Sequence, residues 1–439
     1  MSVSLGQPSP GRTSDEAQQP AGAGPSLTAA DGPSALDRFA HWKELLDRPL
    51  TSYYLILGCT LLLLALGLVI VLSASTAAQI VQHLPPYAVF EKQVLGAGGG
   101  LVIMWVAARM PPRVFRAFAY PLLGASVFGL LLVLVVGQSV DGAERWISLG
   151  GIQMQPSEFA KLAFVLWGAD LLARKEKFRQ LTDSRQLLMP LLPGLALLGT
   201  LVMLGDDLGT TSLLMVIFLA LLWIIGAPAR LLVGMLGLAA FVVLIIIKVH
   251  PYEAQRLAGF LKQSSNCDNQ AACYQLAHGK EALGSGGWFG MGLGASKAKW
   301  GSVPESTSDF VFAILGEELG LLGTLCVIAL YGGIAFAGLR IARRVQDTFT
   351  RLAAGAITVW IVAQAMVNIG AVLGVLPITG VPLPLISAGL SSLLVTMTAL
   401  GILMSFARSE PGARQALAAA GPGTLRRLLG WLGMYQRRQ

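Results

Sequence analysis

Long apolar runs, separated by short polar or glycine-rich stretches, repeat along most of the chain. A helix needs about 20 such residues to cross about 30 Å of hydrocarbon, so the pattern predicts a set of membrane-spanning helices. The fourth of these begins with charged residues, and only the break at 205–209 divides the fifth from the sixth. We predict ten spans, near 53–74, 90–109, 118–137, 157–173, 188–204, 210–226, 231–250, 309–338, 353–375 and 388–407.

Composition agrees with this pattern, since 54% of the residues are hydrophobic and 13% are charged. Soluble domains carry about a quarter charged residues. The predicted fold is therefore an all-α polytopic membrane protein, with ten transmembrane helices and a large extracytoplasmic loop between spans seven and eight.

Basic residues in the loops predict the orientation. They follow the second, fourth, eighth and tenth spans, all on one side of the membrane, which the positive-inside rule assigns to the cytoplasm together with both termini. The net charge of +8 thus reflects topology and contact with anionic membrane lipids, and we expect no nucleic-acid partner. These residues are Arg109, Arg113, Arg116, Arg174, Lys175, Lys177, Arg179, Arg340, Arg343, Arg344, Arg408 and Arg414.

Three regions follow from these boundaries. Residues 1–48 are rich in Pro, Gly, Ala and Ser, and they predict a disordered cytoplasmic tail because they offer little apolar surface to bury. Residues 49–408 form the ten-helix membrane domain. Residues 409–439 are a cytoplasmic C-terminal tail that could lie on the inner leaflet as a short basic amphipathic helix. Docking of partner proteins is the alternative use of both tails.

Three longer segments would face outward, at 75–89, 138–156 and 251–308. The last far exceeds the length of a simple connection, which indicates a function. Its glycine-rich part, 284–294, allows close backbone approach and exposes N–H groups, while Lys297 and Lys299 supply positive charge for a phosphate. A flexible linker is the alternative interpretation.

The four cysteines fall into two pairs by location. Cys267 and Cys273 lie in the longest outward segment, where oxidation is permitted, and we predict a small disulfide-closed ring between them. Cys59 and Cys326 lie inside apolar spans, and we expect both to be packed as hydrophobic residues.

Asp309 stands where a polar segment gives way to the eighth apolar run. Ionisable groups at such depth cost a few kcal/mol unless they are paired or face a cavity, so Asp309, Glu317 and Glu318 require partners or a task. Three small residues, Ala313, Gly316 and Gly320, follow Asp309 at helical spacing and would form one smooth helix face. Such a face predicts a groove for a lipid chain or a close helix contact. A helix whose first acid complements the dipole is the simpler alternative.

Charged residues of the second outward segment would lie on the same face of the membrane. Pro156 predicts a helix start, and Lys161 follows Glu158 at a spacing that allows an ion pair. A purely structural pair is one interpretation. The other is that Arg145, Glu158 and Lys161 bring both charge signs to a site for an anionic lipid.

Two further segments converge there. Asp207 lies in the break between spans five and six, and in the segment 380–392 two prolines prevent a continuous helix. The chain is therefore expected to re-enter the membrane as a broken segment, with Ser387 and Ser391 as hydrogen-bond donors.

Five motifs occur in the order QPSEFAKL, DDLGTT, GSGGWFGMGLG, VPESTSDFVFAILGEELG and GVPLPLISAGLSS. Together they resemble the FtsW/RodA/SpoVE (SEDS) family of peptidoglycan glycosyltransferases over residues 53–408, and the long tails resemble its cell-division branch. The resemblance implies polymerisation of lipid II into β-1,4 glycan strands on the outer face of a bacterial cytoplasmic membrane, at the division septum. It also implies as partners the nascent glycan strand, a class B penicillin-binding protein acting as transpeptidase, and other divisome proteins.

The resemblance also assigns site residues. Asp309 matches the essential aspartate of the family and would act as base for the acceptor hydroxyl. Lys299, Arg145, Lys161 or a divalent cation, magnesium or manganese, would face the diphosphate. The remaining expected substrate contacts are Gln155, Glu158, Asp207, Ser387 and Ser391.

Two departures from the family pattern affect this site. The family segment ends in HTDF, whereas this chain reads Ser306, Thr307, Ser308 and Asp309, so the flanking histidine is missing. Ala388 and Leu390 replace the family tyrosine and second glycine. The aspartate is retained.

Two other functions stay open at this stage. A lipid-linked precursor flippase or transporter would also use broken helices and intramembrane charges, although the sequence shows no inverted repeat. A non-catalytic divisome scaffold would act through the tails.

Overall fold

The computed structural model describes residues 50–140, 143–149, 152–177, 184–249, 271–413 and 415. The chain divides into two units, Met1–Asp47 and Arg48–Gln439. The first unit and the segment 416–439 lie outside the described residues, so the predicted properties of both tails stay predictions.

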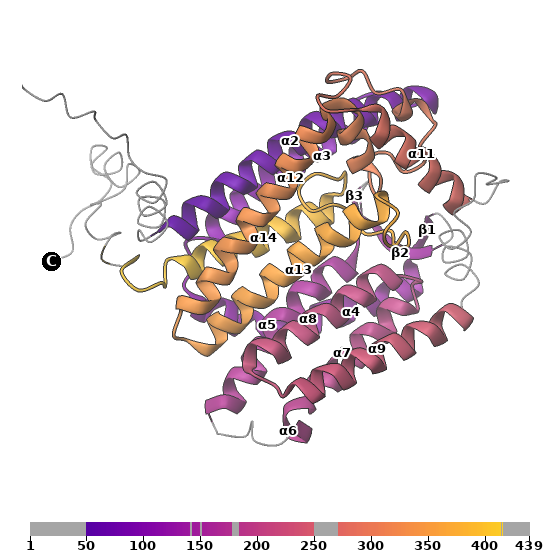
Figure 1. The fold of residues 1–439 in the computed structure, drawn as a ribbon. Helices are drawn as coiled ribbons and strands as arrows, with labels where there is room; N and C mark the ends of the chain where they lie inside the picture. Colours follow the sequence, from indigo (N-terminus) through magenta and orange to yellow (C-terminus); the bar gives the residue numbers. More distant parts are fainter. Residues whose placement is uncertain are drawn as a thin grey trace, which may run out of the picture. The chain divides into compact units, whose positions relative to one another are not determined.

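A helix occupies each of the ten predicted positions (Figure 1). Within the described ranges, seven helices are long and apolar enough to cross a membrane, and the apolar parts of α7 and α9 are shorter. The protein is thus a helical polytopic membrane protein. Its helices are α2 (Thr51–Val81), α3 (Ala88–Ala107), α4 (Pro112–Val136), α5 (Pro156–Lys177), α6 (Ser184–Leu188), α7 (Leu191–Met203), α8 (Leu208–Ile225), α9 (Ala229–Val249), α11 (Ala271–Ser285), α12 (Val311–Arg344), α13 (Thr348–Val372) and α14 (Leu390–Ala407).

The predicted outward segments contain more regular structure than expected. α2 continues to Val81 and α3 begins at Ala88, so most of the first segment is helical. The second forms a small antiparallel sheet in the order β1 (Gln138–Val140), β2 (Ala143–Leu149) and β3 (Ile152–Met154), which adds to the helical membrane fold an element that the sequence analysis did not predict. The third contains α11 and the 3₁₀ turn η1 (Ala298–Trp300), while 250–270 lies outside the described residues.

Local sequence signals account for several helix ends. Pro112 occupies the first turn of α4, where a missing N–H costs nothing. Asp207 and Asp347 cap α8 and α13, and each accepts a hydrogen bond of 2.9 Å from the backbone N–H three residues on. Gly226 ends α8 in the left-handed conformation that favours glycine.

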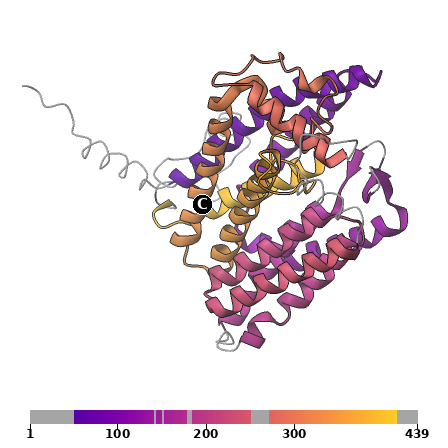
Figure 2. The ribbon, with the colours of Figure 1, turned by 45° about the vertical axis from the view of Figure 1, so that its right-hand side comes forward.

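α13 and α14 lie in the middle of the helix bundle. α13 packs against α12 on one side and against α5 and α8 on the other, while α14 packs against α3 and α2 (Figures 1 and 2). In the 18-residue apolar stretches of α13 and α14, 72% and 78% of the residues are buried inside the protein, compared with 22% in α4. α13 and α14 are therefore largely enclosed by protein, whereas most of α4 is exposed.

α5 belongs to the same enclosed centre, although its sequence marked it only weakly as a span. Its residues from Pro156 to Asp170 are almost all buried. A helix surrounded by other helices needs no lipid-facing apolar surface, so charged residues that find partners are tolerated.

The predicted basic side forms one end of the bundle. Arg116 and Arg174 both pair with the buried Asp170, at 2.5 and 2.7 Å. Arg408 donates a hydrogen bond of 3.0 Å to the carbonyl of Ala108. These contacts join the α3–α4 turn, α5 and the end of α14, and the small sheet lies at the opposite end (Figure 1).

α12 is not continuous. Gly320 has φ 68° and ψ −164°, which divides the element into a short helix over 311–319 and a longer one over 321–344. A break inside a membrane protein leaves backbone groups that need partners. The glycine-rich loop supplies them, because the N–H groups of Met291 and Gly292 bond to the carbonyls of Glu317 and Glu318 at 2.9 and 3.1 Å.

The same loop also accepts hydrogen bonds from α12. Leu321 and Leu322 donate to the carbonyls of Gly287 and Trp288, at 2.9 and 3.2 Å. A Cβ atom at Gly290 would lie 2.1 Å from the Glu318 carbonyl oxygen. The predicted close backbone approach is therefore confirmed, with the broken helix as the partner. The flexible-linker alternative is wrong, and contact of this loop with a phosphate stays a prediction.

The small residues after Asp309 make a helix contact and not a lipid groove. The Cβ position of Gly316 lies 2.2 Å from the Leu283 side chain of α11, and Ala313 is fully buried. Gly320 does not share this helical face because it is the break itself. Of the two alternatives, the structure shows the close helix contact.

The cysteines follow the predictions in part. Cys59 is buried as expected, whereas Cys326 on α12 is exposed, so the expectation that it packs inside the protein is wrong. Cys273 is buried and takes part in a disulfide. Its predicted partner, Cys267, lies outside the described residues, so the pairing stays a prediction.

Gly290→Ala should destabilise the fold more than Gly287→Ala. Both positions have positive φ, 80° and 54°, which costs a residue with a side chain about 1–3 kcal/mol. Only Gly290 faces backbone, since nothing lies within 4 Å of a Cβ at Gly287. Thermal unfolding of the detergent-solubilised variants measures this, and equal losses would contradict the assigned packing of the loop on α12.

Candidate active site

Asp309 ends a turn that leads directly into the short first part of α12. Phe310 is the N-cap and is 1% exposed, whereas Asp309 itself is half-buried. Asp309 thus precedes the first helical turn and does not lie within it. The turn begins at Glu305, whose backbone is in the left-handed region with φ 53°.

Two other elements hold this turn by its backbone. Asn368 on α13 donates from Nδ2 to the Asp309 carbonyl at 2.8 Å and to the Val381 carbonyl at 2.8 Å. The Oγ atom of Ser387 donates to the Ser308 carbonyl at 2.5 Å. The Asp309 backbone is therefore fixed from two sides.

The segment 380–389 is non-helical and buried, as the prolines predicted. Side chains from other helices satisfy its backbone. Tyr331 on α12 donates to the Pro384 carbonyl at 2.5 Å. Gln93 on α3 donates to the Ser387 carbonyl and accepts from the N–H of Gly389, both at 3.2 Å. Unpaired backbone groups at this depth would cost several kcal/mol each, so these side chains keep the re-entrant segment in place.

Ser387 and Ser391 were expected to contact substrate, but both are buried in contacts with this protein. Ser387 Oγ accepts from the Leu383 N–H at 2.8 Å in addition to its bond to the turn. Ser391 Oγ accepts from the Gln155 N–H at 3.0 Å and donates to the Gln153 carbonyl at 3.3 Å. In this arrangement both hydroxyls position backbone.

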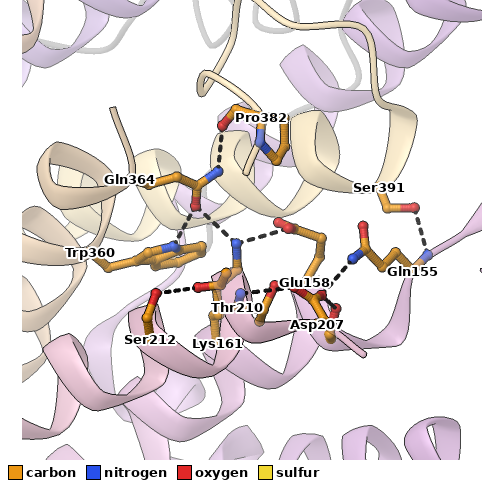
Figure 3. A network of polar contacts seen from close by, with 12 residues as sticks. Gln155, Glu158, Lys161, Asp207, Thr210, Ser212, Trp360, Gln364, Pro382 and Ser391 are labelled. Atoms are coloured by element: carbon orange, nitrogen blue, oxygen red, sulfur yellow. Dashed lines mark hydrogen bonds and ion pairs between the residues drawn. The ribbon is translucent and has the colours of Figure 1, made fainter. Parts of the chain in front are cut away.

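The predicted ion pair between Glu158 and Lys161 is confirmed, with 2.8 Å between Oε1 and Nζ (Figure 3). The two side chains are 1% and 0% exposed. Lys161 also donates to Gln364 Oε1 at 2.9 Å, and its Nζ lies 5.2 Å from the centre of the Trp360 ring. Gln364 in turn donates to the Pro382 carbonyl at 2.9 Å, so the ion pair supports the re-entrant segment.

Asp207 and Gln155 form a second part of this network (Figure 3). Asp207 Oδ2 accepts from Gln155 Nε2 at 3.0 Å and from Ser157 Oγ at 3.2 Å. Since Asp207 also caps α8, its carboxylate joins α8 to the start of α5. Gln155 and Asp207 are buried, and they act here as structural contacts.

Arg145 is the one half-buried cation among the three that sequence analysis directed at a diphosphate. Its Nε donates to the Gly205 carbonyl at 3.1 Å, and its Nη2 donates to the Asp206 carbonyl. These bonds attach β2 to the α7–α8 turn. A guanidinium has five N–H donors, so this arrangement leaves donors for an anion.

Lys299 does not fit the predicted role at a diphosphate. Its ammonium donates to Ser73 Oγ at 2.8 Å, to the Gly294 carbonyl at 2.6 Å and to Glu318 Oε1 at 3.3 Å. An ammonium has three N–H donors, and all three are used. Lys299 is 5% exposed, so its charge serves to neutralise Glu318 beside the break in α12.

Glu317 has a different partner set. Its carboxylate accepts from Ser296 Oγ at 2.5 Å and from the N–H groups of Lys297 and Ala298 at 3.0 and 3.3 Å. It therefore caps the turn that carries Lys299. Glu317 and Glu318 are thus both buried in contacts with this protein, whereas Asp309 is half-buried.

Within the part of the chain that the structure describes, Asp309 lies neither in a cluster of metal-binding side chains nor in the cavity at the basic end of the bundle. No group of three or more His, Cys, Asp or Glu side chains that could hold a metal occurs among the described residues. A cavity of about 830 Å³ lies at the basic end, lined among others by Arg113, Arg116, Asp347 and Glu410. The need for magnesium or manganese stays a prediction.

Sequence analysis missed three amide side chains that carry much of the geometry, namely Gln93, Gln364 and Asn368. Each is at most 4% exposed. Gln364 and Asn368 are four residues apart on one face of α13, inside an apolar helix. A polar residue at membrane depth is itself a signal of function or of a specific partner, and that signal was present in the sequence.

Comparison with known proteins finds relatives that match most of the chain. Residues 53–411 match the family model described as cell cycle protein, FtsW/RodA/SpoVE. The probable peptidoglycan glycosyltransferase FtsW of Mycobacterium tuberculosis is 40% identical over 394 residues, which cover 89% of this chain and 74% of the relative. Stage V sporulation protein E of Bacillus subtilis is 34% identical over 353 residues, with coverage of 80% and 95%.

Solved structures agree with the fold. A chain from a peptidoglycan synthase complex that polymerises and crosslinks superposes with a TM-score of 0.66 at 27% identity, over 80% of this chain and 96% of that chain. The rod shape-determining protein RodA of Thermus thermophilus gives a TM-score of 0.59 at 27% identity, with coverage of 83% and 99%. The family model spans the helical unit from α2 to the end of α14, and the chain belongs to the FtsW/RodA/SpoVE family of cell cycle proteins.

Proposed function

We propose that this protein is a peptidoglycan glycosyltransferase of the cell-division type, which polymerises lipid II into β-1,4 glycan strands. The observation that carries the proposal is Asp309, a half-buried carboxylate whose backbone is fixed by α13 and by the re-entrant segment. Family membership and a relative named as a probable peptidoglycan glycosyltransferase support the same activity.

In this proposal Asp309 is the general base. A sugar hydroxyl is a weak nucleophile, and a carboxylate within hydrogen-bond reach accepts its proton as the glycosidic bond forms. The acceptor 4-hydroxyl oxygen attacks the anomeric carbon of the donor, the bond from that carbon to the diphosphate breaks, and the proton passes to Asp309. Inversion at the anomeric carbon gives the β link.

The leaving diphosphate needs compensation of its charge more than it needs a proton. Lys161 and Lys299 are buried and engaged by carboxylates, so we assign this role to Arg145, which is half-buried. Its bonds to the Gly205 and Asp206 carbonyls hold the guanidinium in one orientation. In this proposal the other predicted contact residues position the backbone around the site. They are Gln155, Glu158, Asp207, Ser387 and Ser391.

The proposed topology has ten spans, formed by α2, α3, α4, α5, α7, α8, α9, α12, α13 and α14. The arginine-rich end would face the cytoplasm, together with both termini, and Asp309 would face outward. This orientation supports a bacterial cytoplasmic membrane and a substrate delivered to its outer face. We propose location at the division septum, which the description of the family as cell cycle proteins supports.

A transpeptidase is the proposed partner. A chain of a complex that both polymerises and crosslinks peptidoglycan shares this fold, which supports a class B penicillin-binding protein beside this protein. The cytoplasmic tails are the proposed contacts for other divisome proteins.

Purified protein supplied with fluorescent lipid II provides the direct test of the activity. A polymerase should convert it into glycan strands in detergent, without a membrane gradient. A flippase would move the lipid between leaflets of a vesicle without lengthening it, and a scaffold would do neither. Either of the last two results, obtained with well-folded protein and its transpeptidase partner present, would overturn the proposal.

Asp309→Asn should abolish strand synthesis while the protein stays folded. The amide keeps the shape of the side chain but cannot accept the hydroxyl proton. The measurement is lipid II polymerisation beside thermal unfolding of the same preparation. Near-normal synthesis by a folded Asn variant would remove Asp309 from the role of base.

Asn368→Ala should lower kcat about tenfold or more, because it releases the Asp309 carbonyl and a small displacement of a catalytic group is costly. The KM for lipid II should change less, since Asn368 is 2% exposed and does not face substrate. Met366→Ala, at a 66% exposed position of the same helix, serves as the matched control. An Asn368 variant with unchanged kcat would show that this contact does not position Asp309.

Removing one member of the Glu158–Lys161 pair should cost about 3–5 kcal/mol of stability, since the other charge is left buried without a partner. Replacing both, as Glu158→Gln with Lys161→Met, should cost clearly less than the sum of the single changes. The measurement is a double-mutant cycle, in which the free energy of unfolding is compared among the two single variants, the double variant and the parent protein. A double variant as unstable as that sum would mean that the two side chains do not interact.

A further inference from the structure

The glycine-rich loop between α11 and η1 exposes large apolar side chains. Trp288, Phe289 and Leu293 are 66%, 81% and 61% exposed, and Met291 is 41% exposed. The surfaces of soluble proteins rarely expose such side chains together, so a cluster of this kind indicates contact with a membrane or with a protein partner.

The exposure is not a consequence of a loose loop. Four backbone hydrogen bonds fasten the loop to both sides of the break in α12. A Cβ atom at Gly286 would lie 2.0 Å from the Gly316 carbonyl oxygen, which leaves no space between loop and helix. The backbone is therefore fixed, and the aromatic side chains project away from α12.

The position of the break gives the depth of the loop in the membrane. At a rise of about 1.5 Å per residue, the second part of α12, 321–344, is about 36 Å long, slightly more than the hydrocarbon core of about 30 Å. Its far end carries Arg343 and Arg344, which belong at the polar boundary. Its near end, where the loop is bonded, therefore lies at the opposite boundary.

The apolar loop surface is also continuous with a surface that must meet lipid. Leu321, Leu322 and Leu325 on the adjoining turns of α12 are 41%, 52% and 50% exposed. Leu322 donates its N–H to the carbonyl of Trp288, so the two surfaces touch. Tryptophan and other aromatic side chains favour the zone between headgroups and hydrocarbon.

We propose that the loop Trp288–Leu293 inserts into the membrane leaflet at the Asp309 end of the bundle and acts as an interfacial anchor. The Glu317 and Glu318 carbonyls bind this loop and also end the short helix that begins after Asp309. Insertion of the loop thus fixes the height of that helix relative to the lipid headgroups. The partner of this surface is the lipid bilayer.

Nitroxide labelling of the full-length protein in lipid nanodiscs tests the insertion. Phe289→Cys and Leu293→Cys would be labelled separately in a background carrying Cys59→Ala and Cys326→Ala, with the oxidised Cys273 left unreactive. Leu325→Cys provides a hydrocarbon reference. Glu281→Cys, whose parent side chain is 76% exposed, provides a water reference.

Labels at Phe289 and Leu293 should collide with dissolved oxygen more than with a water-soluble nickel complex, as at Leu325. Nickel accessibility equal to that at Glu281 would overturn the proposal, since the loop would then be in water. Protection from both reagents would indicate a protein contact and would overturn it as well. The readout needs no lipid II, so it is independent of the glycosyltransferase assay, and unchanged thermal unfolding confirms that each variant is folded.

Discussion

Backbone groups without a helical partner must find one inside the protein at membrane depth, and two such stretches contact the two ends of the short helix that follows Asp309. The break at Gly320 is satisfied by another backbone segment, the glycine-rich loop. The re-entrant segment 380–389 is satisfied by side chains, mainly amides. An amide has two N–H donors and an acceptor oxygen, so a single side chain serves two backbone groups and fixes the distance between them. Asn368 does this for the turn at Asp309 and for the re-entrant segment at once.

The buried charges contribute to this arrangement through contacts within the protein. Glu158 with Lys161 and Glu318 with Lys299 are both nearly inaccessible. In each pair the ammonium has further acceptors, and in each pair one carboxylate oxygen has no hydrogen-bond partner among the described residues. Such pairs add little net stability compared with apolar residues of the same size, but the two charged side chains interact favourably only in one relative arrangement. Their contribution is to the uniqueness of the site.

Much of the fold could be predicted from the apolar pattern, because lipid imposes a length on each span. All ten predicted positions carry a helix, and the prolines at 382 and 384 correctly indicated a non-helical segment. The role of Lys299 could not be predicted, since its partners Ser73 and Glu318 come from distant parts of the chain. The same holds for the glycine-rich loop, whose composition fits a phosphate, a linker or a helix equally well. Its binding to α12 depends on tertiary contact and leaves no local signal.

The burial of α5 has a consequence for how the chain is mapped onto a membrane. Within the described residues, apolar length alone recognises seven helices and omits α5, α7 and α9. Seven crossings would put the two ends of the helical unit on opposite sides of the bilayer, whereas ten put them on the same side. The parity of the topology thus depends on these three helices, and a buried, charged helix such as α5 takes part in deciding which compartment receives the carboxyl end of the chain.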